Sequence, residues 1–188
     1  MKPFSIVASL LLALALPVPA LAIGLQLMPS TAHVSLGDTL SVDVAVSGLG
    51  SGVAPSVGAI DLHVGFDASL LLPIGVDFGP YLGSSAEALF GFDISVPGRV
   101  DFAALSLLAP GDLDALQPAN FRLATLSFSA LASGSATLAL VGEMRVDDAF
   151  GLKLPVPEPA TSWLLAIGLA ICAARAARRT RRRPSSRT

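Results

Sequence analysis

Two histidines, His33 and His63, are the side chains here best suited to act as a general base near neutral pH or as imidazole ligands to zinc. They are thirty residues apart and form no His-x-x-x-His or His-Glu-x-x-His pattern. No Gly-x-Ser-x-Gly motif accompanies them, so a serine hydrolase is not indicated. We interpret both as solvated histidines on strands, with a zinc pair as the less favoured alternative.

Fourteen acidic residues offer two further kinds of chemistry. Two carboxylates flanking a sugar suffice for glycoside hydrolysis, but no pair stands out among the fourteen. Asp112 with Asp114, and Asp147 with Asp148, could give oxygen ligands to Ca²⁺, although neither pair has the spacing of an EF-hand loop. Aspartates that begin turns are the favoured explanation. We therefore predict no catalytic residue, no metal site and no cofactor, with Ca²⁺ only weakly supported.

Charged residues are distributed very unevenly along the chain. The stretch from Asp38 to Glu158 holds all fourteen acidic residues and four basic ones, which gives it a formal charge of −10. Such an acidic segment repels phosphates, so a nucleic-acid partner is not expected. The only cysteine, Cys172, falls in a later apolar run and is interpreted as apolar filler. No disulfide or thiolate site is therefore expected in the acidic stretch.

The segment from Pro155 onward has three physical zones. Three prolines, at 155, 157 and 159, form a stiff extended spacer. The apolar run 160–177 is eighteen residues, about 27 Å as a helix, and crosses a bilayer if Arg175 reaches the headgroups. Trp163 then lies at the opposite interface, and Arg178 and Arg179 begin a cluster that marks the cytoplasmic side. A buried helix of a soluble protein is the alternative.

This order of zones resembles the PEP-CTERM sorting signal of Gram-negative bacteria. The residues that carry the resemblance are Val156, Pro157, Glu158, Pro159, Ala160 and Thr161, followed by the hydrophobic helix and the arginine cluster. The resemblance implies recognition and cleavage near the Pro-Glu-Pro triplet by exosortase, an inner-membrane cysteine-dependent enzyme. It also implies transfer of the mature protein to the cell surface or to an extracellular polysaccharide matrix.

The first residues form a secretory signal peptide. Lys2 gives the positive start, residues 4–16 are apolar, and Ala20 and Ala22 fit the small-x-small cleavage site. Cleavage is expected after Ala22, and an uncleaved anchor is the alternative. We thus expect a signal peptide at 1–22, an exported domain at 23–154, the Pro-rich sorting motif at 155–161, a transmembrane helix at 162–177 and a cytoplasmic tail at 178–188.

The exported domain has the pattern of an all-β protein. Apolar residues alternate with polar ones, as in residues 40–47, and turn signals recur every 8–12 residues. Pro73 predicts an edge strand or a bend. We expect a loop at 48–58, a short helix near 84–89, a loop or helical turn at 113–120 and a flexible connection at 131–135. The expected strands are 25–28, 33–35, 40–47, 60–66, 70–78, 90–96, 99–107, 121–131, 136–141, 143–146 and 150–154. This pattern predicts an antiparallel two-sheet sandwich.

Three strand segments, 34–42, 58–71 and 121–128, resemble those of cohesin domains, with Phe66 where tyrosine is commoner. The resemblance implies a jelly-roll sandwich of a class that binds dockerins or related modules. It brings no short motif for the partner-binding face.

We predict a non-enzymatic exported protein, anchored in the inner membrane with its domain in the periplasm and then moved to the surface or matrix. Its expected partners are exosortase and either extracellular polysaccharide or another surface protein. A sugar-binding surface has little support, because the chain holds one tyrosine and its only tryptophan is Trp163. A secreted polysaccharide hydrolase, and a dockerin-like partner-binding adhesion or scaffold module, are the alternatives.

Overall fold

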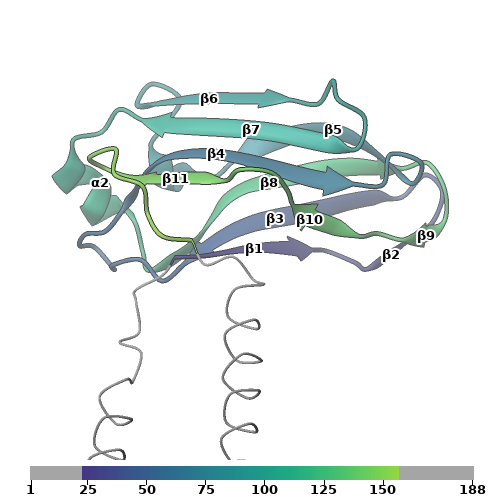
Figure 1. Cartoon of the computed structure of the whole chain (residues 1–188), viewed down its shortest axis with the longest axis horizontal. Helices are drawn as coiled ribbons and strands as arrows, with labels where there is room; N and C mark the ends of the chain where they lie inside the picture. Colours follow the sequence, from purple (N-terminus) through teal and green to yellow (C-terminus); the bar gives the residue numbers. More distant parts are fainter. Residues whose placement is uncertain (1–22, 157–188) are drawn as a thin grey trace, which may run out of the picture. The chain divides into compact units, whose positions relative to one another are not determined.

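Two antiparallel sheets stack face to face in residues 23–156, the part of the chain that this computed structural model describes (Figure 1). The first sheet has the order β1 (Gly24–Pro29), β3 (Thr39–Ser47), β8 (Asn120–Ala130) and β5 (Leu71–Phe78). In the second sheet, β10 (Leu138–Leu140) and β11 (Arg145–Asp148) both pair with β4 (Val57–Phe66), which is followed by β7 (Arg99–Ser106) and β6 (Ala88–Asp93). A small third sheet joins β2 (His33–Val34) to β9 (Gly134–Ser135). The predicted sandwich is confirmed.

The core lies between the two large sheets and follows from the alternation in the sequence. Val42, Val44 and Val46 of β3 are fully buried, as are Leu126 and Phe128 on the neighbouring β8. The intervening serine, aspartate and threonine side chains of these strands face outward because successive side chains of a strand point to opposite sides. Burying one such apolar side chain contributes about 1.5–3 kcal/mol.

Pro73 lies on an edge strand, as predicted. β5 is the last strand of its sheet, and its register against β8 shifts between Pro73 and Gly75. Proline has no backbone N–H to give to a sheet, so it is tolerated at an edge beside a bulge.

Two of the predicted elements are wrong. Residues 150–154 form no strand beyond a single bridge between Lys153 and Asp147, because residues 148–152 make a tight turn that the Asp148 side chain stabilises. The short helix expected at 84–89 is also wrong, since β6 already begins at Ala88. A 3₁₀ turn, η1 (Pro80–Leu82), precedes it instead.

Several boundaries also differ from those expected. The helix α2 spans Pro110–Leu116, so it starts before the loop or helical turn predicted at 113–120. Its proline stands in the first turn, where a missing N–H costs nothing. β4 begins three residues before the predicted start, and β11 lies two residues later than predicted. The connection predicted as flexible at 131–135 contains β9.

The two ends of the domain meet. The backbone N–H of Ile23 donates to the carbonyl oxygen of Pro155 at 3.1 Å, and the N–H of Leu154 donates to Val146 at 2.8 Å. Ile23 and Leu154 are both buried. The first residue after the predicted signal peptide is therefore held beside the first residue of the predicted Pro-rich sorting motif.

The predicted signal peptide 1–22, with Ala20 and Ala22, lies outside the described residues, and so does the chain from Pro157 onward. That part includes the predicted transmembrane helix 162–177. Within residues 23–156, no helix has the length and hydropathy needed to cross a bilayer. Both membrane-related expectations stay predictions.

Candidate interaction surface

The outward face of the second sheet carries the groups of most chemical interest, and strand register arranges them in rows. Inward positions on β4 and β7, such as Leu62 and Phe102, are buried, so their neighbours face outward. From the end near α2, three rows cross the sheet: Leu89–Leu105–Ala59–Asp147, Gly91–Ala103–Asp61–Arg145, and Asp93–Asp101–His63.

The first two rows line a shallow groove whose β6 and β7 side is apolar. Leu89 and Leu105 are 60% and 46% exposed, although each is a large apolar side chain in a regular strand. Beside them Gly91, Ala103 and Ala59 have little or no side chain, so a groove runs over the sheet. Exposed leucines next to small residues leave room for a surface that packs against them.

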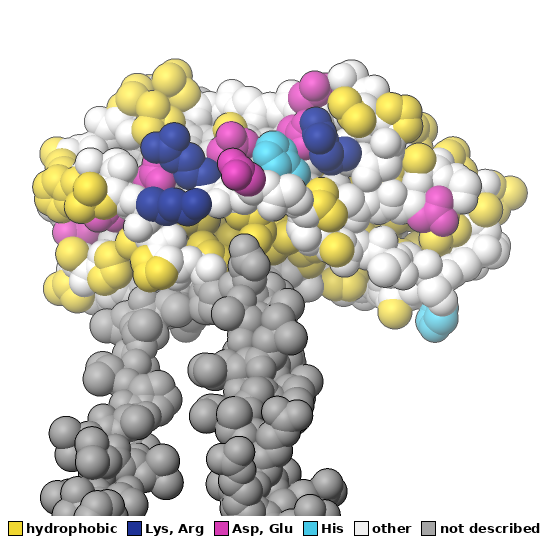
Figure 2. Space-filling model, in the orientation of Figure 1, with side chains coloured by type: hydrophobic (Ala, Val, Ile, Leu, Met, Phe, Trp, Pro, Cys, Tyr) yellow, Lys and Arg dark blue, Asp and Glu magenta, His cyan; other side chains and the backbone are white. Residues whose placement is uncertain are grey.

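Charged side chains border this groove. Figure 2 shows acidic and basic side chains side by side along the middle of the molecule, with hydrophobic side chains gathered at the left, where Figure 1 places α2. An apolar centre with a polar rim is the usual composition of a protein–protein contact.

Two Arg-Val-Asp tripeptides build part of this charged border. In each, the valine (Val100 or Val146) is buried and the flanking arginine and aspartate face outward. Arg99 donates to Asp101 at 2.7 and 3.0 Å on β7, and Arg145 donates to Asp147 at 2.6 Å on β11. The repeated Arg-Val-Asp tripeptide is the sequence signal for these pairs, which were not among the predicted site residues.

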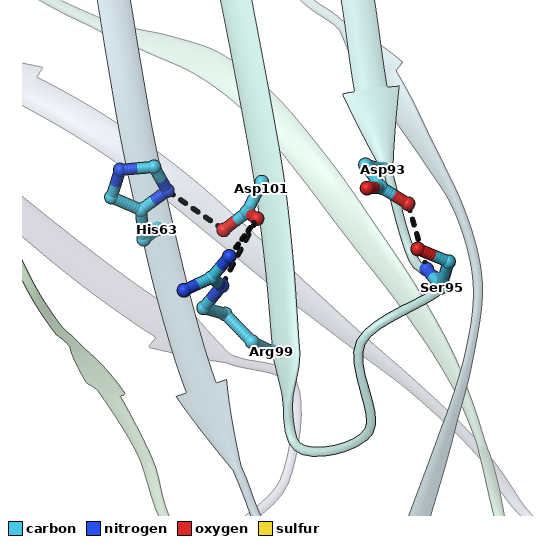
Figure 3. A network of polar contacts seen from close by, with 5 residues as sticks. All are labelled: His63, Asp93, Ser95, Arg99 and Asp101. Atoms are coloured by element: carbon cyan, nitrogen blue, oxygen red, sulfur yellow. Dashed lines mark hydrogen bonds and ion pairs between the residues drawn. The ribbon is translucent and has the colours of Figure 1, made fainter.

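Asp101 also pairs with His63, one of the two predicted candidate histidines. Figure 3 shows the histidine ring, from β4, and the Arg99 guanidinium, from β7, converging on one carboxylate. His63 Nδ1 lies 2.7 Å from Oδ1 of Asp101, while the Arg99 guanidinium donates to Oδ2 of the same carboxylate. The arrangement fixes the orientation of the ring across the sheet, so His63 presents its other nitrogen, Nε2, for a further contact.

Asp147 is the most deeply buried carboxylate of the face. Its side chain is 5% exposed, and Arg145 engages only Oδ2. Oδ1 is buried with no hydrogen-bond partner within the described residues. Asp147 also lines the groove, where it is the most deeply buried charged side chain.

Asp93 ends the third row in an ionised state. The backbone N–H of Ser95, with its hydroxyl in support, donates to the Asp93 carboxylate and lowers the pKa of Asp93 below its ordinary value (Figure 3). The carboxylate therefore stays charged well into the acidic range, and the acidic character of this edge persists there.

Asp101→Asn is expected to lower the free energy of unfolding by about 1 kcal/mol, because it weakens the ion pair with Arg99 and the hydrogen bond with His63 at once. Urea unfolding measures the change. Asp77→Asn on β5 is the matched control, since Asp77 is exposed and forms no ion pair with another described residue. Equal stability of the two variants would contradict a structural role for the Asp101 pairs.

The structure keeps the other predicted candidates apart. His33 lies on β2, where its Nδ1 is 3.0 Å from the Ser135 hydroxyl, and His63 lies on another sheet. Asp112 and Asp114 lie on α2. Asp148 accepts from the N–H groups of its own turn, as the interpretation of turn aspartates predicts. Among residues 23–156, no three His, Cys, Asp or Glu side chains gather in a metal-binding arrangement.

The sequence after Pro155 is similar to a known family. The PEP-CTERM protein-sorting motif matches residues 155–183, which include the sorting residues from Val156 to Thr161, Trp163, Arg175, Arg178 and Arg179. The chain carries a PEP-CTERM sorting motif. The roles of the individual residues in this PEP-CTERM motif stay predictions. Among curated proteins, none matches the chain.

The domain that precedes the PEP-CTERM motif has the fold of cohesin domains. It is similar to the sixth cohesin of Acetivibrio cellulolyticus scaffoldin B, solved in complex with a Cel5 dockerin, with a TM-score of 0.57 and 19% identity over 71% of this chain and 93% of that one. A type I cohesin–dockerin complex of Clostridium thermocellum gives a TM-score of 0.57 at 12% identity over 72% and 93%. The cohesin module of a Clostridium perfringens family 33 glycoside hydrolase gives 0.56 at 12% over 72% and 90%. The cohesin-like fold predicted from the strand segments is confirmed.

Proposed function

We propose that this chain is an exported, non-catalytic surface protein that exosortase processes at its PEP-CTERM motif. The matched motif at 155–183 supports the sorting, and the signal-peptide pattern at 1–22 supports export. The apolar run after Thr161 holds the precursor in the inner membrane, and cleavage near Pro157-Glu158-Pro159 frees the domain for the cell surface or the extracellular matrix.

We infer that the sandwich binds a protein partner through the outward face of β6, β7, β4 and β11. The observation that carries this proposal is the pair of exposed leucines, Leu89 and Leu105, beside the groove and its charged border. Two of the similar cohesins are described in complex with dockerins, which makes protein binding a natural use of the fold.

The chemistry of the face indicates the kind of partner. Five carboxylates lie on it or beside the groove against two arginines, so basic or donor groups on the partner are favoured. The carboxylates are those of Asp61, Asp93, Asp101, Asp147 and Asp148. Sugars stack on aromatic rings, whereas the outward rows of this face present leucines. A protein surface therefore fits it better than a polysaccharide does.

Replacing Leu89 and Leu105 together by lysine is expected to abolish partner binding, since it removes the apolar contact and repels a basic partner. The measurement is photo-crosslinking in the host envelope from a benzoylphenylalanine placed at Ala103, with the product read as a discrete mass. The double variant should lose the product by about tenfold or more, which corresponds to about 1.4 kcal/mol.

Leu72→Lys is the matched control, because Leu72 is a 52% exposed leucine on β5, the edge strand of the other sheet. It should leave the crosslinked product unchanged. Equal yields from the control and the double variant would refute binding through this face.

A further inference from the structure

The turn between β11 and Pro155 presents two of the three most exposed large apolar side chains among residues 23–156. Phe150 is 70% exposed and Leu152 is 66% exposed, and only Leu36 exceeds them. Neither residue packs into the core, and neither lies in the groove described above. Two large apolar side chains kept in water two residues apart in one turn require a reason.

This turn is held in a fixed shape. Oδ1 of Asp148 accepts from the N–H of Phe150 at 2.8 Å and from the N–H of Leu152 at 2.9 Å. The N–H of Asp148 donates to the carbonyl of Leu152, and Gly151 takes the positive φ of 77° that the turn needs. The apolar pair is therefore presented in one conformation, so little conformational entropy is lost when it binds a surface.

The turn also carries one cationic group, in a domain whose acidic residues outnumber its basic ones. Lys153 follows Leu152 directly and forms no ion pair with another described residue. Arg145 lines the same depression as Lys153, together with the acidic Glu143 and with Asp147, which Arg145 neutralises. Exposed apolar side chains next to a free lysine match the apolar and phosphate layers of a lipid surface.

Chain length places a membrane within reach of this turn. Leu152 is three residues before Pro155, and the hydrogen bond from Ile23 pins Pro155 to the domain. The apolar run begins at Ala160, five residues later, and five residues span at most about 17 Å. A domain tethered so closely to a bilayer meets that surface far more often than it meets any soluble partner.

We propose that the turn Asp148–Lys153 is a membrane-contact site that docks the precursor on the bilayer in which it is anchored. Phe150 and Leu152 enter the headgroup region, and the Lys153 ammonium faces lipid phosphates. The contact fixes the orientation of the domain, so the sorting motif leaves the domain at a defined height above the bilayer. This inference rests on the proposed anchoring by the segment after Thr161.

A single-tryptophan experiment tests the contact in the full-length chain. Trp163 is the only tryptophan, so Trp163→Phe removes the background signal and Phe150→Trp introduces a reporter in the turn. The protein is reconstituted in vesicles of phosphatidylethanolamine and phosphatidylglycerol with bromine on the upper acyl chain. Leu36→Trp in the same background is the matched control. Leu36 is 72% exposed and lies in the turn just before Thr39, the first residue of β3.

Bromolipid quenching is expected to be about twofold or more stronger at position 150 than at position 36. Equal quenching of the two reporters in protein that floats with the vesicles would overturn the membrane contact and leave the anchoring intact. A chain that does not float with the vesicles would overturn the anchoring itself, and the contact with it.

Discussion

A chain in which Pro157, Glu158 and Pro159 are all replaced by alanine is expected to accumulate at full length in the membrane fraction. The prolines fix an extended backbone, and Glu158 supplies the only charge between Lys153 and Arg175. Alanine favours helix, so the substitution extends the apolar run toward the domain and removes the extended charged segment that an enzyme would read. Processing should fall from nearly complete to undetectable.

Intact mass of the protein from envelope and medium measures this outcome. The unaltered chain should yield a species that begins at Ile23 and ends between Pro157 and Thr161, and only in a host that has exosortase. Pro184→Ala, in the arginine-rich segment, is a matched control that should be processed normally. Normal processing of the triple variant would contradict recognition of the Pro-Glu-Pro triplet. A full-length species with and without the enzyme would mean that the segment acts only as a membrane anchor.

Gln117→Leu is expected to lower the free energy of unfolding by about 3–5 kcal/mol, although it conserves side-chain volume. Gln117 is 1% exposed and follows α2 directly. Its side chain accepts from the Val57 N–H at 2.7 Å and donates to the carbonyls of Val57 and Tyr81 at 2.8 and 2.9 Å. Leucine removes the side-chain partner of three backbone groups, two of them at buried hydrogen bonds, and each lost partner costs about 1–3 kcal/mol.

Urea unfolding of the exported domain tests this prediction against Gln26→Leu, which changes an exposed glutamine on β1 in the same way. The control should shift stability by about 0.5 kcal/mol or less. The loss at Gln117 equals a fifth or more of the stability of a typical domain, about 5–15 kcal/mol, so reduced secretion of the variant is also expected. A change below about 1 kcal/mol would mean that solvent or a rearranged backbone replaces the three hydrogen bonds.

The strands could be predicted because burial imposes a period of two on each of them. The alternation of Val42, Val44 and Val46 can be recognised in the sequence without knowing the partner strand. Pro73 predicts an edge strand because proline has no backbone N–H to donate to a neighbouring strand. The sorting motif was equally accessible, since its three zones follow one another directly in the chain.

The binding face and the buried glutamine could not be predicted in the same way. Leu89 and Leu105 become neighbours through strand register, which no local pattern specifies. Gln117 bonds to backbone groups 60 and 36 residues away, and a polar residue after a short helix gives no sign of burial. The turn at 148–152 was mistaken for a strand because Phe150, Leu152 and Leu154 alternate as a strand would, although two of them face solvent.

The meeting of Ile23 and Pro155 has a mechanical consequence. A pull applied between the two ends opens the Ile23–Pro155 hydrogen bond, then separates β1 from β3 and Leu154 from Val146 one bond at a time, beginning at the ends. Bonds that break in sequence resist far less force than a ladder loaded all at once. Force applied between the two ends of the domain is therefore expected to unfold the sandwich more readily than force applied along its paired strands.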